Sequence, residues 1–303
     1  MEYVLTTDNL TKVYGEHKAV NRISMHVKKG AIYGFIGKNG AGKTTFMKMV
    51  AGLSRQTEGS MQLFESNDLE FQRKRIGCLI ENPGMYANRT AKENLEILRR
   101  NLGIVEKNAV EDILEFVGLK GVGKKKVKNF SMGMKQRLGI AISLLSHPDF
   151  LILDEPINGL DPEGILEIRE LLLKLNKEKE ITILISSHIL GELSKIATHY
   201  GILREGVLIE EFDAKELDER CKRCQKIDVD NVELAVSILE EKLHINNFDV
   251  LGQGVIRVFD NFERIECINK ELILGGVNIR ESYLTGQDLE GYFMELLGGA
   301  SND

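Results

Sequence analysis

Residues 37–44 read "GKNGAGKT", a glycine-rich octapeptide that fits the pattern G-x-x-x-x-G-K-[ST]. The apolar stretch "AIYGFIG" (31–37) leads into it, and the helical stretch "TTFMKMVAGL" (44–53) follows it. This pattern binds phosphate when a strand precedes it and a helix begins at its end. Both signals are present, which disfavours the alternative of an ordinary glycine-rich turn that contains a lysine.

Each residue type in this loop has a physical role. Gly37, Gly40 and Gly42 let the backbone bend tightly enough for successive N–H groups to face phosphate oxygens. The helix that follows adds positive potential at its N-terminus. Lys43 is expected to reach the β- and γ-phosphates of a nucleotide, and Thr44 to offer its hydroxyl group to Mg²⁺.

A second motif, "FLILDEP" (150–156), reads as a buried strand followed by two adjacent carboxylates. Ligands of parallel α/β sheets collect at the carboxyl ends of the strands. We expect Asp154 to belong to the Mg²⁺ shell and Glu155 to orient or deprotonate the attacking water. The alternative, an acidic turn without chemistry, is disfavoured by the phosphate-binding loop in the same domain.

Four other residues are weak signals individually. His188 directly follows the apolar stretch "ITILISS" (181–187) and is placed to donate to a γ-phosphate, although a lone histidine is usually structural. Glu81 directly follows the stretch "RIGCLI" (75–80), and Asp161 follows the carboxylate pair. Tyr14 precedes the glycine-rich loop and is placed to stack on adenine.

The composition excludes several classes of protein. A net charge of −6 argues against a nucleic-acid binder that neutralises phosphates, and the lysine run at 124–126 is interpreted as a solvated loop. No signal peptide is recognisable, and the longest apolar runs are far below the ~20 residues of a membrane span. The four cysteines form no disulfide framework, and we interpret "CKRC" (221–224) as structural or incidental rather than as a zinc or redox site.

The chain is expected to contain two domains. Up to residue 213, apolar strands alternate with helical patterns, which predicts an α/β domain with a largely parallel sheet. A helical subdomain is predicted at about 84–146, where "TAKENLEILRRNLG" begins at the N-cap candidate Thr90 and stops at Gly103. Residues 214–303 are predicted to form a small α+β domain.

The predicted order of elements in residues 214–303 is β-α-β-β-α-β, that of a ferredoxin-like unit. On its first helix the apolar residues Val232, Val236, Leu239 and Leu243 share one face; on its second helix the residues that do so are Phe262, Ile265, Ile268 and Leu272. No catalytic constellation is visible, so we interpret this unit as a regulatory or dimer-supporting appendage.

Taken together and in this order, the motifs in residues 3–212 resemble the nucleotide-binding subunit of ATP-binding cassette (ABC) transporters. The resemblance implies a P-loop NTPase that hydrolyses ATP with Mg²⁺. It implies catalytic roles for Glu155, His188, Lys43 and Glu81, and metal contacts for Thr44, Asp154 and Glu81. The residues that it implies to bind nucleotide are Tyr14, Gly37, Lys38, Asn39, Gly40, Ala41, Gly42, Lys43, Thr44, Thr45, Ser131, Gly133 and Asp161.

The stretch "FSMGMKQRL" (130–138) takes its meaning from this resemblance, because it stands at the family's signature motif. In the family, this motif contacts the ATP of a second subunit. Ser131 and the N–H group of Gly133 begin a long helix whose positive end would face the γ-phosphate held by that subunit. One cassette in this chain therefore implies a homodimer that encloses two nucleotides.

The sequence departs from the family's pattern at three positions. Met132 and Met134 replace the first glycine and the glutamine of the usual LSGGQ signature, which puts the glutamine's sugar contact in doubt. Glu81 replaces the usual glutamine. With these replacements the chain looks most like the bacitracin-resistance and lantibiotic-immunity exporters, and its C-terminal extension suits the bacitracin type.

Glu81 has an electrostatic consequence. We expect Asp154, Glu155 and Glu81 to converge near one metal, where each like pair at ~4 Å costs on the order of 1–4 kcal/mol. Only a divalent cation would then make the arrangement tolerable. Our hypothesis is that Glu81→Gln weakens the dependence of ATP hydrolysis on Mg²⁺ and disturbs coupling to a membrane partner.

The resemblance implies a cytoplasmic ATPase, peripheral on the inner face of the membrane, that powers a separate permease through a contact near Glu81–Leu95. Export of a peptide antibiotic is the expected function, and export of other drugs or lipids is the alternative. A soluble cassette ATPase acting on ribosomes or DNA is disfavoured, because the chain has one cassette and no heptad repeat. A sensing module that binds ATP without transport is a third hypothesis.

Overall fold

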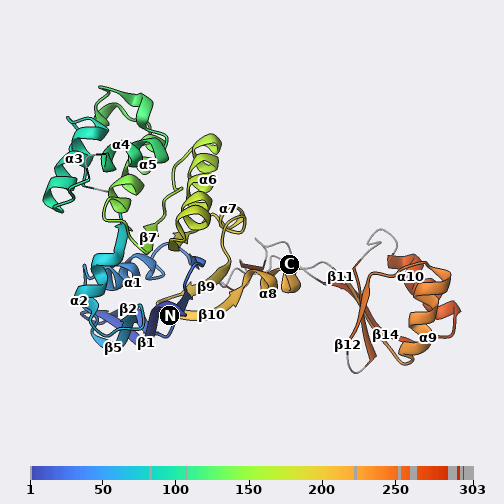
Figure 1. Ribbon diagram of the computed structural model, residues 1–303. Coiled ribbons are helices and arrows are strands. Elements are labelled where there is room, and N and C mark those ends of the chain that lie inside the picture. The colour runs from blue at the N-terminus through green and yellow to red at the C-terminus, as the bar shows by residue number, and fades with distance from the viewer. Residues whose placement is uncertain are drawn as a thin grey trace. The chain divides into compact units, whose positions relative to one another are not determined.

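The computed structural model describes residues 2–81, 84–106, 108–221, 224–251, 254–259, 265–285, 292–293 and 296 (Figure 1). The chain divides into two compact units, Met1–Ala214 with Leu296–Asp303, and Lys215–Glu295. Some features named above lie outside the described residues: Asn82 and Pro83 in the predicted permease contact, 222–223 between two cysteines, Phe262, and the C-terminal residues 297–303.

A six-stranded sheet in the order β10-β9-β4-β8-β7-β6 forms the centre of the first unit. Neighbouring strands are parallel except β9 and β10, which form an antiparallel hairpin. Strands β4 and β8 are buried along their whole length, as expected for central strands of a parallel sheet. The bounds are β4 Ile32–Ile36, β6 Ile76–Leu79, β7 Phe150–Asp154, β8 Thr182–Ser187, β9 His199–Arg204 and β10 Val207–Asp213.

The first unit also contains a smaller antiparallel sheet, in which β1 pairs with β2, β3 and β5. Its strands are β1 Tyr3–Tyr14, β2 His17–Ile23, β3 His26–Lys28 and β5 Glu58–Leu63.

The stretch "RISMHV" (22–27) has the apolar alternation of a single strand, but the structure divides it, because β2 ends at Ile23 and β3 begins at His26. Arg22 has a φ of 52°, which takes the backbone out of the extended conformation. The hydroxyl group of Thr7 then donates to the carbonyl of Ile23 (3.0 Å) and accepts from the amide of Met25 (2.9 Å), which fixes the break.

Helix α1 (Lys43–Val50) packs into a hydrophobic core that contains residues of both sheets. Its side chains Phe46 and Met47 are fully buried there. The core therefore fixes the helix that begins at the glycine-rich loop. The other helices of this part are α2 Leu69–Gln72, η1 Arg73–Arg75, α6 Pro162–Lys179 and α7 Leu190–Leu193, and α8 Ala214–Cys221 follows β10.

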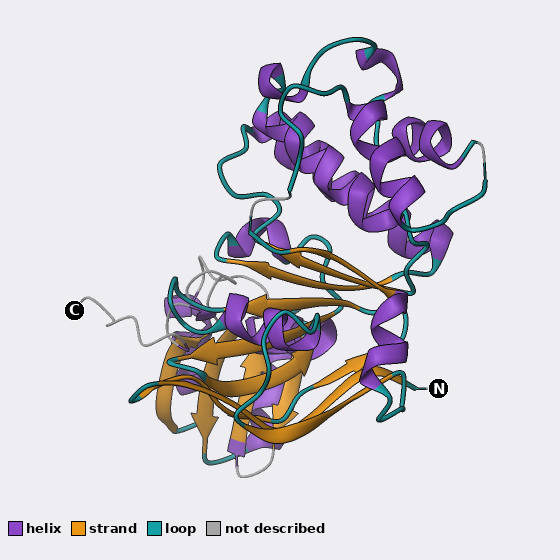
Figure 2. Ribbon diagram, turned by 90° about the vertical axis from the view of Figure 1, so that its left-hand side faces the viewer, coloured by secondary structure: helices purple, strands orange, loops and turns teal. Residues whose placement is uncertain are grey.

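A group of helices interrupts the sheet between β6 and β7, and Figure 2 shows it above the strands. Thr90 caps the first of these helices in a reciprocal capping box with Glu93, and Gly103 (φ 69°) follows its end, as predicted. No described helix is long and apolar enough to span a bilayer. The elements are α3 Ala91–Asn101, α4 Ala109–Phe116, η2 Lys120–Val122, η3 Val127–Asn129 and α5 Met132–Leu144.

The second unit has the predicted βαββαβ order. Its antiparallel sheet runs β12-β13-β11-β14, the strand order of a ferredoxin-like fold, and two helical segments pack on it. The first predicted helix differs in form, because α9 continues as the π-helical turn η4. The bounds are β11 Cys224–Val229, α9 Val232–Ser237, η4 Ile238–Lys242, β12 Phe248–Leu251, β13 Val255–Val258, α10 Ile265–Leu274 and β14 Ile279–Thr285.

Candidate functional site

The glycine-rich loop joins β4 to α1 at the carboxyl edge of the large sheet. Two of its glycines are required by close backbone contacts. A Cβ on Gly42 (φ 105°) would lie 2.2 Å from the carbonyl oxygen of Ala19, and one on Gly37 would lie 2.6 Å from that of Leu203. Gly42 caps α1 without a side-chain acceptor, and the first turn has no acidic residue, so this helix end suits an anion.

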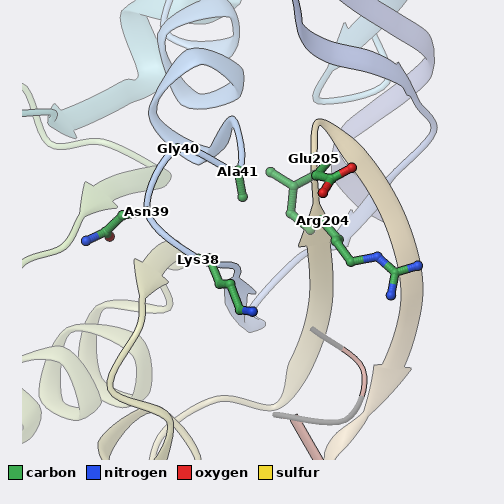
Figure 3. A pocket seen from close by; sticks show the side chains of 7 residues that line it. Lys38, Asn39, Gly40, Ala41, Arg204 and Glu205 are labelled. Carbon is green, nitrogen blue, oxygen red and sulfur yellow. The ribbon is translucent and has the colours of Figure 1, made fainter. Parts of the chain in front are cut away.

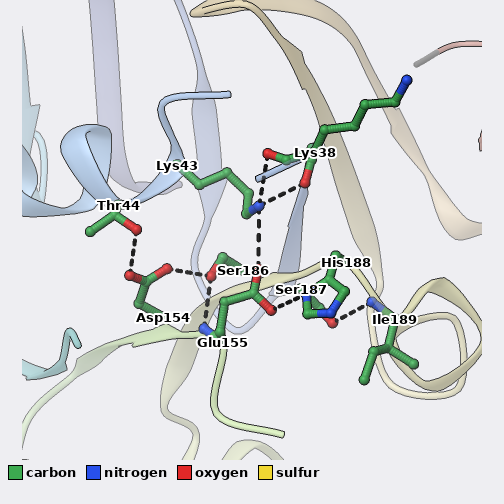
Figure 4. A network of polar contacts seen from close by, with 10 residues as sticks. Lys38, Lys43, Thr44, Asp154, Glu155, Ser186, Ser187, His188 and Ile189 are labelled. Atoms are coloured by element: carbon green, nitrogen blue, oxygen red, sulfur yellow. Dashed lines mark hydrogen bonds and ion pairs between the residues drawn. The ribbon is translucent and has the colours of Figure 1, made fainter. Parts of the chain in front are cut away.

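Lys43 is buried at the start of α1, with 6% of its side chain exposed. Its ammonium group donates to the carbonyl oxygens of Gly37 (2.6 Å) and Lys38 (3.4 Å). It also lies 3.3 Å from Oε1 of Glu155, an oxygen that is buried and has no hydrogen-bond partner. The loop thus holds one cation beside one carboxylate, as Figure 4 shows.

A chain of hydrogen bonds links α1, β7 and β8 (Figure 4). The hydroxyl group of Thr44 donates to Oδ2 of Asp154 (2.6 Å), and that of Ser186 donates to Oδ1 of Asp154 (2.6 Å). Ser186 also accepts from the backbone N–H of Glu155 (2.8 Å). Sequence reasoning missed Ser186, although it belongs to the quoted stretch "ITILISS".

His188 follows β8, and its Nδ1 lies 2.7 Å from Oε2 of Glu155. The carboxylate of Glu155 therefore lies between Lys43 and His188, with one oxygen toward each. Glu155 itself has a φ of 50°, a left-handed conformation that is costly for a residue with a side chain. The surrounding contacts hold it there, which is typical of a functional residue.

The structure does not gather Glu81 with the other two carboxylates, so the predicted three-carboxylate cluster is absent. The carboxylate of Glu81 instead accepts from the ammonium group of Lys48 on α1, at 2.6 Å. Among the described residues, no group of three or more His, Cys, Asp or Glu side chains is placed to hold a metal ion. The physical reason is charge compensation, because a lysine provides the cation that the sequence argument assigned to a metal.

The remaining predicted residues lie in three places. Tyr14 ends β1 with its ring half exposed, and the ammonium group of Lys12 lies 4.9 Å from the ring centre. Ser131 is the N-cap of α5 and accepts from the amide of Met134 (3.2 Å). Asp161 caps α6 by accepting from the amide of Gly164 (3.0 Å).

Ser131 and Gly133 lie at the start of α5 in the helical region, which Figure 1 draws apart from the label of α1. The described contacts of these two residues include those with Met134 and Gly164, and none is with the glycine-rich loop of the same chain. A role in nucleotide binding would require the loop of another chain.

A pocket of about 600 Å³ adjoins the outer side of the glycine-rich loop (Figure 3). Lys38, Asn39, Gly40 and Ala41 line it on one side, and the turn between β9 and β10 lines it on the other. Glu155 and His188 do not line this pocket. The pocket therefore contains neither the carboxylate of Glu155 nor the imidazole of His188.

The donor atoms present fit Mg²⁺. This ion is usually bound through one or two protein oxygen ligands together with phosphates. The hydroxyl group of Thr44 and the carboxylate of Asp154 are such ligands, and they already lie within hydrogen-bond distance of each other. They project from two elements that meet at the edge where the phosphates are expected.

Comparison with known proteins decides the family. The model of the protein family described as "ABC transporter" matches residues 20–158 of this chain. The chain is 46% identical over 302 residues to the "Bacitracin transport ATP-binding protein BcrA" of Enterococcus faecalis, an alignment that covers 99% of this chain and 98% of that protein. This chain belongs to the ABC transporter family.

Two other similarities concern the cassette itself. The "Lantibiotic transport ATP-binding protein SrtF" of Streptococcus pyogenes is 45% identical over 218 residues, 70% of this chain and 93% of that protein. A dimeric ATP-binding cassette in a post-hydrolysis state, bound to ADP and Pi, has a TM-score of 0.63 at 25% identity, covering 69% of this chain and 98% of that one. The predicted family, cassette fold and subgroup are confirmed, and the chain is an ATPase that binds ATP.

The buried hydroxyl group of Ser186 gives a first prediction for this ATPase. We expect Ser186→Ala to lower kcat on the order of ten-fold, because Asp154 loses a hydrogen bond and the amide of Glu155 loses its acceptor. Steady-state ATPase assays measure this. The matched control is Ser187→Ala, since this equally buried hydroxyl accepts only from the amide of Ile189. An equal loss of kcat in both variants would contradict the role given to Ser186.

Proposed function

We propose that this cassette is the ATP-hydrolysing subunit of a membrane exporter, and that the cargo is a peptide antibiotic of the bacitracin or lantibiotic type. The observation that carries the hydrolytic part is the carboxylate of Glu155 between Lys43 and His188, beside the Thr44–Asp154 pair. Similarity over nearly the whole chain to a bacitracin transport protein supports the cargo class.

In this proposal, each catalytic residue acts at a stated atom. The ammonium group of Lys43 binds the β- and γ-phosphates at the mouth of α1. The negative charge of the phosphates draws this ammonium group away from Glu155. The freed carboxylate of Glu155 accepts a hydrogen bond from the attacking water and then takes the proton of that water. His188 holds the other oxygen of Glu155, and it donates a hydrogen bond to the γ-phosphate once that phosphate is bound.

Thr44 and Asp154 would hold Mg²⁺, and Ser186 would fix the orientation of Asp154. When bound, the ion would neutralise charge on the β- and γ-phosphate oxygens. The backbone N–H groups of residues 37–45 would hold the remaining phosphate oxygens at the positive end of α1. Tyr14 would offer its exposed ring to adenine.

Two copies of the chain are needed for a complete site in this proposal. The N-terminus of α5, with Ser131, Gly133 and no acidic residue in its first turn, would face the γ-phosphate bound by the other copy. Asp161, at the start of α6, would lie at the contact between the copies. A cassette dimer among the similar structures supports this arrangement.

The segment Glu81–Leu95 is the proposed contact with the permease. It begins at the edge of the sheet where hydrolysis takes place and ends inside α3, so a displacement at Glu81 would be passed to a helix. The cassette would then be peripheral on the inner face of the membrane. Two relatives are named transport ATP-binding proteins, and this supports a permease as the partner of the cassette.

The cargo class is tested in the source cells. We expect cells that lack this chain to become several-fold more sensitive to bacitracin or to a lantibiotic, with no change toward chemically unrelated drugs. Cells that carry only the Glu155→Gln chain should be equally sensitive, because hydrolysis is needed. Sensitivity only to small apolar drugs or to lipid perturbation would favour the alternative cargo and reject the proposed one.

A further inference from the structure

Two carboxylates occupy equivalent places on neighbouring strands. Strands β6 and β7 are parallel, with Leu79 beside Leu153. Glu81 and Glu155 each follow two residues later, and both have a positive φ, 59° and 50°. The two carboxylates therefore follow adjacent strands at the carboxyl edge of the sheet, each within reach of α1.

One helix supplies a lysine to each carboxylate. Lys43 of α1 lies 3.3 Å from Glu155, and Lys48 of the same helix lies 2.6 Å from Glu81. Lys48 also comes one helical turn after Thr44, so the two residues share a side of α1. The helix that carries the proposed metal ligand therefore also holds the carboxylate of the neighbouring strand.

We propose that Lys48 is a positioning residue that holds Glu81 when no metal is bound and competes with the metal ion for its carboxylate. This inference rests on the proposed function, because it requires a metal-dependent nucleotide site at Thr44 and Asp154. When the divalent cation binds, it replaces the ammonium group of Lys48 as the positive partner of the Glu81 carboxylate. Glu81, the first residue of the proposed permease contact, then changes partner when metal and nucleotide bind.

The burial of the pair suits such an exchange. The side chain of Lys48 is 32% exposed and that of Glu81 is 62% exposed. Ion pairs at this exposure are screened by water and are weak. Lys43, by contrast, is 6% exposed and is held by two carbonyl oxygens as well. Of these two lysines on α1, Lys48 is the one whose partner can be exchanged easily.

The test measures nucleotide binding, and not turnover, by calorimetric titration with ATP in Mg²⁺ and in EDTA. The ratio of the two affinities is the metal enhancement. We expect Lys48→Met to raise it about two- to five-fold, because the carboxylate of Glu81 is released, and Lys48→Arg to leave it unchanged. Glu81→Gln should lower the enhancement. Lys48→Met added to Glu81→Gln should have no further effect.

The EDTA titration separates this role from a general one. The inference is overturned if Lys48→Met weakens ATP binding equally with and without Mg²⁺. It is also overturned if Lys48→Met changes the metal enhancement as much in the Glu81→Gln variant as in the unaltered chain. Lys120→Met is the matched control, since Lys120 forms an exposed ion pair with Glu115 at 2.7 Å within the helical region. Absence of any metal enhancement in the unaltered chain would instead reject the proposed function.

Discussion

The Glu155→Gln variant should lose ATP turnover by on the order of 10²–10⁴-fold while it still binds ATP. The glutamine keeps the shape of the side chain between Lys43 and His188. Its amide accepts no proton from water, so the chemical step fails although the phosphates remain bound. In the proposed cycle ATP closes the dimer and hydrolysis reopens it, so the variant should accumulate as an ATP-bound dimer.

Two measurements check this expectation: phosphate release under steady-state conditions, and molar mass by light scattering with and without Mg²⁺ and ATP. Glu205→Gln is the control, because this exposed carboxylate lies in the turn between β9 and β10 and has no bond to Lys43 or His188 among the described contacts. Turnover of Glu155→Gln close to that of the unaltered chain would remove Glu155 from the mechanism.

Lys43→Met should weaken ATP binding on the order of 10²-fold or more, which is about 3 kcal/mol. Methionine keeps the length of the buried side chain but removes its charge. The phosphates then lose their cation, and the buried oxygen of Glu155 loses its neighbour at 3.3 Å. Both effects act against the triphosphate, because an uncompensated carboxylate repels it.

Calorimetric titration with ATP measures the loss. Lys74→Met serves as the control, since this exposed lysine lies against the ring of Phe71 (5.5 Å to its centre) and is remote in sequence from the loop. An ATP affinity of Lys43→Met within two- to three-fold of the unaltered chain would mean that the backbone of the loop alone holds the phosphates.

The parts of the fold that sequence predicted best are those with strong local signals. The glycine-rich loop, the capping box at Thr90 and the largely buried strands β4, β7 and β8 depend on neighbouring residues. Strands β5, β9 and β10 are not among the strands predicted from the sequence. In β5 and β10 only alternate or single positions are buried, and the buried positions of β9 include Gly201. A search for continuous apolar runs does not detect such strands.

The parts of the site that sequence could not predict depend on long-range contacts. Ser186 is hydrogen-bonded to Asp154, 32 residues away in the sequence, and Lys48 to Glu81, 33 residues away. No local pattern distinguishes Lys48 from the other lysines of the chain. The electrostatic argument required a cation beside Glu81, but only the position of α1 against β6 shows that a lysine is available.

The central claim, that this ATPase powers a permease, is tested most directly by isolating the tagged chain from gently solubilised membranes of its source cells. Mass spectrometry then identifies the proteins that copurify with it. The account predicts a polytopic membrane protein in stoichiometric amount, lost when the contact at Glu81–Leu95 is disrupted. Recovery of ribosomal proteins alone, or of no membrane protein, would contradict it and favour a cassette ATPase without a permease.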